Sequence, residues 1–169
     1  MLRTTTALGL LVALSSAPAL AEELNLYSAR HYDTDLRIYE NFTAATGIEI
    51  NLIEGAGEEL MERIRTEGAN SPADLFVTVD GGRLHQAVMA GIFQPIDSAV
   101  LEARVPANFQ HPDNLWFGLS ARARVIFTRT GERPDWLDTY EDLADPRLAG
   151  EICIRSSSSV YNISLMAEM

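Results

Sequence analysis

The chain has 169 residues, of which 47% are hydrophobic, 22% charged and 8% aromatic. This length allows one ordinary domain or two small ones, and the proportions exclude a disulfide-stapled miniprotein, a collagenous chain and a disordered one. The 24 acidic side chains outnumber 13 basic ones, all of them Arg, and the net charge is −11. Because such a surface repels polyphosphates and anionic lipids, neither nucleic acid nor an anionic membrane is an expected partner.

The first 21 residues have the features of a secretory signal peptide. Arg3 supplies a positive start, residues 7–14 form an apolar run, and residues 19–21 (ALA) form a small-x-small cleavage site. The apolar run is too short to span a bilayer, and a buried N-terminal helix is the alternative interpretation. We therefore expect export without membrane insertion. The single Cys153, in an apolar run, is expected to be a buried and inert thiol.

After the signal, short β-type runs alternate with helical patterns. Strands are expected over 24–28, 48–53 and 74–80, and helices over 33–46, 58–67 and 83–90. Gly47, Gly68 and Gly91 follow the three helices, as glycine does at many helix ends. This order predicts an α/β fold with a mainly parallel sheet.

The second half of the chain has a less regular pattern. An irregular stretch follows Gly91, and residues 116–129 indicate a long extended segment or a pair of strands. A new unit is expected from Thr139, with a strand over 151–155 and a helix over 160–169. The last helical pattern has only begun where the sequence ends, which suggests either a piece of a longer protein or a short terminal helix.

The first candidate binding residues follow the expected first strand. In residues 28–33 (SARHYD), the adjacent His31 and Tyr32 occupy the loop at the carboxyl end of that strand. Ligands of open α/β folds bind at this edge of the sheet. The alternative interpretation is a surface histidine beside a tyrosine packed on the sheet edge.

Two further groups of polar residues lie in the second half. Residues 156–159 are four serines at an expected helix start, where free backbone N–H groups attract anions, and Arg155 and Tyr161 flank them. A simple N-cap would need only one serine. Arg122 and Arg124 are two residues apart and therefore share one face of an expected strand. There they either hold an anion together or pair with the surplus acidic side chains. The candidate anion-binding residues are Arg122, Arg124, Ser156, Ser157 and Ser158.

Other functional motifs are missing from the sequence. Residues 55–57 (GAG) lack the third glycine of a dinucleotide fingerprint. The three scattered histidines and the single cysteine give no zinc-binding spacing. The nucleophile motif Gly-x-Ser-x-Gly of serine hydrolases does not occur.

Six segments resemble, in order and with matching spacing, the periplasmic ferric-iron-binding proteins of bacterial ABC transporters. They are residues 26–35 (LYSARHYDTD), 42–48 (FTAATGI), 65–75 (RTEGANSPADL), 91–95 (GIFQP), 116–118 (WFG) and 155–162 (RSSSSVYN). Within that family, the sequence is most similar to the iron-deficiency-induced protein A-like subgroup, which uses a histidine and tyrosines. The likeness covers essentially the whole chain after the signal.

The resemblance implies the α/β fold of type II periplasmic binding proteins, in which two lobes joined by crossing strands close on Fe(III). Residues 22–118 are then expected to form the N-terminal part of the first lobe. Residues 119–169 would form the crossing strands and the start of the second lobe. Because family members are much longer, we expect an incomplete fold and a truncated N-terminal half of such a protein.

By the same resemblance, His31, Tyr32 and Tyr161 correspond to metal ligands. The family holds Fe(III) mainly by tyrosine phenolates, with help from a histidine or a synergistic anion such as carbonate. A pair of adjacent tyrosines that the family uses later in its chain is absent here. Fe(III) is a hard cation that prefers anionic oxygen, so its binding should release phenol protons and weaken in acid.

We therefore expect a periplasmic solute-binding component that takes up ferric iron with an ABC transporter permease of the inner membrane. It is expected to be a monomer at full length and not an enzyme. The alternative is a periplasmic binding protein for a small anion, held by Arg122, Arg124 and the loop 156–159. An exported enzyme with Ser, His and Asp assembled across loops is a third hypothesis, which no local motif supports.

Overall fold

The computed structural model describes residues 22–30 and 32–169, so the expected signal peptide, residues 1–21, and His31 lie outside the described residues. Within these ranges, no helix is long and apolar enough to cross a bilayer. The strands and α-helices in chain order are β1 (Glu23–Ser28), α1 (Asp33–Thr46), β2 (Glu49–Glu54), α2 (Gly57–Glu67), β3 (Leu75–Val77), α3 (Gly81–Met89), α4 (Ala99–Arg104) and α5 (Val160–Glu168).

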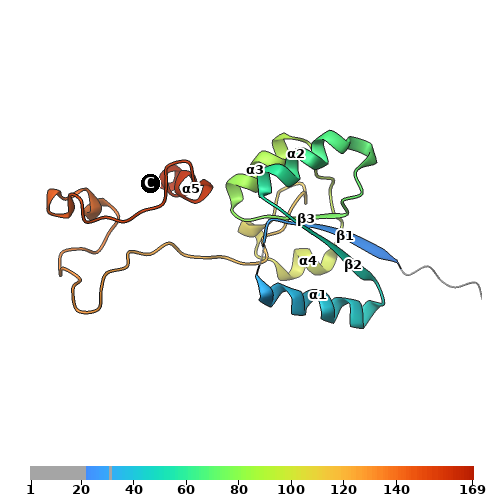
Figure 1. Cartoon of the computed structure of the whole chain (residues 1–169), viewed down its shortest axis with the longest axis horizontal. Coiled ribbons are helices and arrows are strands. Elements are labelled where there is room, and N and C mark those ends of the chain that lie inside the picture. The colour runs from blue at the N-terminus through green and yellow to red at the C-terminus, as the bar shows by residue number, and fades with distance from the viewer. Residues whose placement is uncertain (1–21, 31) are drawn as a thin grey trace, which may run out of the picture.

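The three strands form one parallel sheet in the order β2-β1-β3. Figure 1 shows α1 on one face of this sheet and α2 and α3 on the opposite face. The chain therefore passes from β1 through α1, on one face, to β2. It then passes from β2 through α2, on the opposite face, to β3 on the other side of β1. Such a reversal creates a crevice at the carboxyl ends of the strands, where ligands of open α/β sheets bind. The loops after β1 and β3 both emerge there.

The core of this sheet lies between β1 and α2. Tyr27, Leu60 and Ile64 form its buried cluster, and the two α2 residues are four apart on one helix face. The helical spacing of Leu60 and Ile64 explains why both side chains are buried against the sheet. The C-terminal end of α1 at Gly47 is also as expected, because that glycine has φ 77° and its N–H donates to the Thr43 carbonyl.

Several local expectations are wrong. β3 is shorter than expected because it pairs with β1 only as far as Ser28, where β1 turns into its loop. Residues 151–155 form a loop with no strand partner in the described ranges, so Cys153 is exposed and not buried. Helix α4 was not anticipated; the Ser98 hydroxyl accepts from the Leu101 N–H and caps it.

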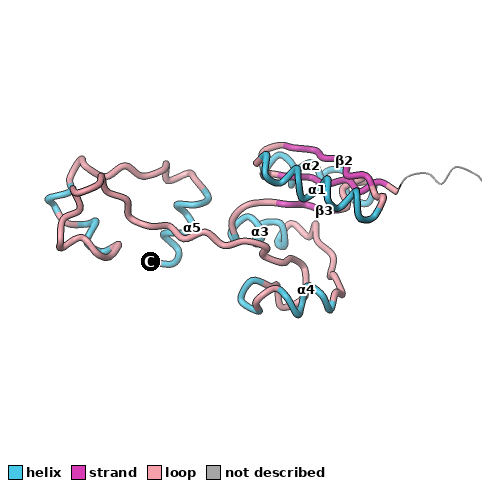
Figure 2. The backbone as a smooth tube through the Cα atoms, turned by 90° about the horizontal axis from the view of Figure 1, so that it is seen from below, coloured by secondary structure: helices cyan, strands magenta, loops and turns pink. Residues whose placement is uncertain are grey.

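The chain after residue 118 leaves the sheet and then returns to it. Residues 119–128 run as an extended segment away from the sheet, and the following turns lead back to α5 (Figures 1 and 2). Helix α5 packs beside α3, which both views show. The returning helix therefore brings the C-terminal part of the chain to the crevice at the carboxyl ends of the strands.

Candidate functional site

The loop after β1 is fixed by its own polar side chains. The Ser28 hydroxyl accepts from the Arg30 N–H and donates to the Arg30 carbonyl, both at 3.1 Å. The Arg30 guanidinium then donates two hydrogen bonds to Asp35 in the first turn of α1, at 2.8 and 3.1 Å. Its central carbon lies 5.0 Å from the ring centre of Tyr32, which is 42% exposed. Tyr32 is the residue before α1. Its ring is therefore exposed to solvent on one side and lies next to Arg30, which Asp35 holds in place.

Tyr161 lies in the first turn of α5 and is surrounded by arginines. The guanidinium carbons of Arg124 and Arg155 are each 5.0 Å from its ring centre, and that of Arg122 is 5.5 Å away. These contacts come from the extended segment after the sheet and from the loop before α5. Three guanidinium groups thus lie close to one phenol ring, where the ring quadrupole attracts cations.

Arg122 connects the two tyrosines. Its Nη1 donates to the Tyr32 hydroxyl and its Nη2 to the Tyr161 hydroxyl, each at 3.2 Å. The hydrogen bonds to Tyr161, and then to Tyr32, raise the pKa of the Arg122 guanidinium above its ordinary value. The structure thus brings together two of the sequence-derived candidate ligands and one of the candidate anion-binding arginines, and one cation is shared by both phenol oxygens.

The other candidate anion-binding residues are arranged differently. Arg124 forms an ion pair of 3.6 Å with Asp80, at the end of the loop after β3. The hydroxyls of Ser156 and Ser158 lie 2.9 Å apart, and the Ser158 N–H donates to the Ser156 hydroxyl. These two serines therefore stabilise their own turn before α5, next to Ser157. The α5 N-cap residue, Ser159, makes no side-chain capping bond.

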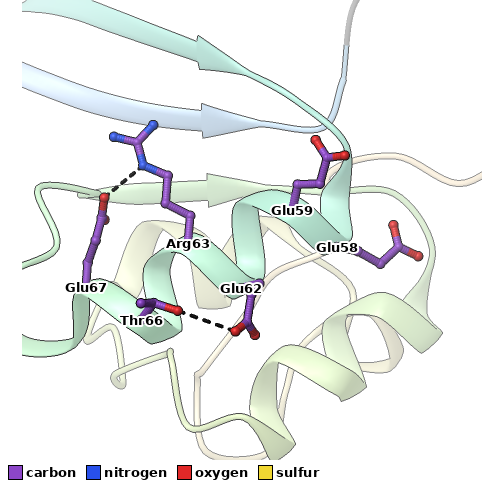
Figure 3. Close-up of a pocket in the computed structure, with 6 residues that line it drawn as sticks. All are labelled: Glu58, Glu59, Glu62, Arg63, Thr66 and Glu67. Carbon is purple, nitrogen blue, oxygen red and sulfur yellow. Dashed lines mark hydrogen bonds and ion pairs between the residues drawn. The ribbon is translucent and has the colours of Figure 1, made fainter.

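A hollow of about 430 Å³ lies at the carboxyl ends of β1 and β2. Its lining residues are Ser28, Ala29, Arg30, Glu54, Gly55 and Ala56. A second hollow, of about 620 Å³, lies on the outer face of α2 and is lined by four glutamates with Arg63 and Thr66. Figure 3 shows that the Glu58 and Glu59 side chains diverge, while Arg63 is paired with Glu67. Only the first hollow borders the loop that presents Tyr32.

Sequence reasoning missed three residues that shape the site. Arg30 and Asp35 form a bidentate pair, and Tyr32 is the N-cap residue of α1, without a side-chain capping bond. Asp80 caps α3 and pairs with Arg124. An aspartate at the end of an expected strand and before two glycines was the available signal.

The Arg30–Asp35 pair gives the first testable prediction. Asp35 is nearly buried, so Asp35→Asn should cost about 1–3 kcal/mol of unfolding free energy at pH 7 by leaving Arg30 without its carboxylate. Urea unfolding followed by circular dichroism measures this. Asp113→Asn is the matched control, because Asp113 is exposed and its carboxylate makes no hydrogen bond or ion pair within residues 22–30 and 32–169.

The same pair predicts a pH dependence. The hydrogen bond from Arg30 holds the pKa of Asp35 below its ordinary value. The stabilisation is therefore complete above the unfolded carboxyl pKa of about 3.9 and is lost as pH falls through the lower folded-state pKa. The difference between the wild-type chain and Asp35→Asn should shrink over that interval. A difference that stays constant down to complete protonation of the carboxyl would contradict the ion pair.

Comparison with known proteins gives one family and several close relatives. The family described as Bacterial extracellular solute-binding protein matches residues 17–150. Iron uptake protein A1 of Synechocystis sp. is 53% identical over 157 residues, which are 92% of this chain and 44% of that protein. The Fe(3+)-binding periplasmic protein of Serratia marcescens is 29% identical over 94% of this chain and 47% of that protein. The chain thus spans about half the length of the curated relatives it matches.

Solved structures give the same result. A Trichodesmium protein (IdiA, FutA) in complex with iron and citrate ligands has a TM-score of 0.79 and 56% identity, over 86% of this chain and 46% of that chain. The ferric binding protein from Campylobacter jejuni has a TM-score of 0.81 and 39% identity, over 86% of this chain and 46% of that chain. The similarity therefore extends over both the sheet and the returning C-terminal part.

Proposed function

The chain belongs to the bacterial extracellular solute-binding proteins, and we propose that it binds ferric iron in the periplasm for uptake by an ABC transporter. Its α/β fold, with a small parallel sheet, is part of the type II periplasmic binding protein fold. The similar proteins are uptake and binding proteins, which favours a binding function over an enzymatic one.

One observation supports this function most strongly: Tyr32 and Tyr161, far apart in the sequence, direct their hydroxyls at the same guanidinium. Phenolate oxygen is a hard anionic donor, which is what Fe(III) prefers. The two phenols already share one positive charge in the structure. The donor set therefore fits a highly charged cation better than a neutral solute.

We assign the ligand roles as follows. Tyr32 and Tyr161 coordinate the iron, together with His31, which lies outside the described residues. Arg122 and Arg124 balance the charge of the phenolates. Ser156, Ser157 and Ser158 hold a synergistic anion such as carbonate beside the metal. Three protein ligands leave coordination positions for oxygen donors from the chelator that delivers the iron, for which citrate is suitable.

The wider setting belongs to the same proposal. Residues 1–21 direct export to the periplasm, residues 22–118 belong to the first lobe, and residues 119–169 form the crossing segment and the start of the second lobe. The partner is the permease of an ABC transporter in the inner membrane. At full length, the protein carries iron to it as a monomer.

Equilibrium dialysis tests the function against its alternative, the binding of a small anion through Arg122, Arg124 and the loop 156–159. The chain is dialysed against ferric citrate, against citrate alone and against phosphate. We expect one iron per chain from ferric citrate, with a lower affinity as pH falls because protons compete for the phenolates. Saturable retention of phosphate without any retention of iron would favour the anion-binding protein and refute the ferric one.

A further inference from the structure

Asp80 ends the loop after β3 in an unusual conformation. Its φ is 73°, which is rare for a residue with a side chain, and its carboxylate accepts from the Gly82 N–H at 2.9 Å. This contact caps the N-terminus of α3. Capping α3 needs only Oδ1 of Asp80. The carboxylate nevertheless has two more partners.

Both additional partners lie in the C-terminal part of the chain. The Ser164 hydroxyl of α5 donates to Asp80 Oδ1 at 2.5 Å, and Arg124 Nη2 lies 3.6 Å from Asp80 Oδ2. The Asp80 side chain is only 10% exposed. One nearly buried carboxylate thus contacts α3, α5 and the extended segment together.

Gly82 shows how closely α5 approaches at this point. A Cβ atom at position 82 would lie 3.1 Å from Asp80 Oδ1 and 3.3 Å from the Ser164 hydroxyl oxygen. It would also lie 3.7 Å from Val160 Cγ2. Because Gly82 has no side chain, the Asp80 carboxylate and α5 can approach each other closely at this point.

The two partners of Asp80 are linked to the tyrosine site by simple spacing. Ser164 follows Tyr161 by three residues, so both lie on one face of α5. Arg124 follows Arg122 by two residues, so both lie on one side of the extended segment. A contact that fixes Ser164 therefore orients Tyr161, and a contact that fixes Arg124 orients Arg122.

We propose that Asp80 is a positioning residue that holds α5 and the Arg122–Arg124 segment against the sheet, so that Tyr161 meets Tyr32 at one point. The role in iron binding rests on the function proposed above, but the docking of α5 does not. The partners described for the Asp80 carboxylate are Gly82, Ser164 and Arg124, none of which is a proposed iron ligand, so Asp80 acts through Ser164 and Arg124. The competing explanation is that Asp80 only caps α3.

Three variants separate the two explanations. Asp80→Asn keeps a side-chain oxygen for the Gly82 N–H and for Ser164 but removes the charge that faces Arg124. Ser164→Ala keeps the cap and the ion pair but removes the bond to α5. Asp113→Asn is the control, since its exposed carboxylate has no hydrogen bond or ion pair in the described part of the chain.

The first measurement is amide hydrogen exchange of the metal-free chain, resolved by segment. In Ser164→Ala, exchange in α5 should become about threefold to tenfold faster, as expected for the loss of one hydrogen bond, while α3 stays unchanged. In Asp80→Asn, α3 should also stay unchanged because the cap remains. If α5 exchanges at the wild-type rate in Ser164→Ala, Asp80 does not hold that helix through Ser164 and the proposal is wrong.

The second measurement is the affinity for ferric citrate by dialysis. Asp80→Asn should weaken it about tenfold or more, within the range for residues that orient metal ligands, whereas a pure cap would leave it at the wild-type value. An unchanged affinity in Asp80→Asn would overturn the link to the site. If the wild-type chain itself retains no iron, the proposed function fails, and amide exchange still decides whether Asp80 docks α5.

Discussion

Replacing Tyr161 with Phe is expected to weaken the binding of Fe(III) by more than about a hundredfold. Substitutions behind a metal ligand cost about tenfold to a hundredfold, and this one removes a proposed ligand itself. The phenyl ring can still lie against Arg124 and Arg155, so α5 keeps these packing contacts. Competitive dialysis of the variant and the wild-type chain against ferric citrate measures the loss.

Tyr140→Phe is the matched control for this substitution. Tyr140 precedes the short 3-10 helix Glu141–Ala144 and takes no part in the contacts around Arg122. The Tyr140→Phe variant should bind iron with the affinity of the wild-type chain. If Tyr161→Phe retained the wild-type affinity while Tyr140→Phe behaved as a neutral control, Tyr161 would not be a ligand.

Leu60→Ala is expected to cost about 2–5 kcal/mol of unfolding free energy, the largest stability effect that we predict. Leu60 is 5% exposed and packs against Tyr27 and Ile64, so the shortened side chain leaves a cavity between α2 and β1. The same β1 strand leads into the loop of Tyr32. Denaturant unfolding, followed by circular dichroism, measures the change in the midpoint and in the slope.

Leu119→Ala is the control for this substitution, because Leu119 is 79% exposed and its truncation should change the free energy by no more than about 0.5 kcal/mol. A loss below about 1 kcal/mol in Leu60→Ala would show that the cluster with Tyr27 does not carry the stability of the sheet.

The elements that could be predicted are those decided by local sequence. The spacing of Leu60 and Ile64 defines a helix face, and Gly47 ends its helix because glycine accepts a positive φ. The order of strands and helices is enough to predict a parallel sheet. These features need no knowledge of distant contacts, and the structure confirms them.

The elements that could not be predicted depend on distant partners. Residues 151–155 have an apolar pattern typical of a strand, but no neighbouring strand pairs with them in the described ranges, so they stay a loop and Cys153 is exposed. The length of β3 is likewise set by where β1 ends. A strand requires its partner, which a local pattern does not contain.

The candidate site shows the same division. Tyr32 could be placed at the carboxyl end of the sheet from the strand pattern alone, and Tyr161 at a helix start. Their common contact with Arg122 required α5 to return to α3, which depends on the bond between Asp80 and Ser164. Asp80 itself had no signal beyond its position at the end of an expected strand and before two glycines, because Arg124 and Ser164 come from much later in the chain.

The visible absorption spectrum of the chain with ferric citrate tests the central claim most directly, namely that Tyr32 and Tyr161 together bind Fe(III). Iron bound by phenolate oxygen has a charge-transfer band in the visible, which ferric citrate alone does not reproduce. We predict this band in the wild-type chain and in Tyr140→Phe, and its loss in the double variant Tyr32→Phe/Tyr161→Phe. A folded wild-type chain without the band, or a double variant that keeps it, would contradict the claim.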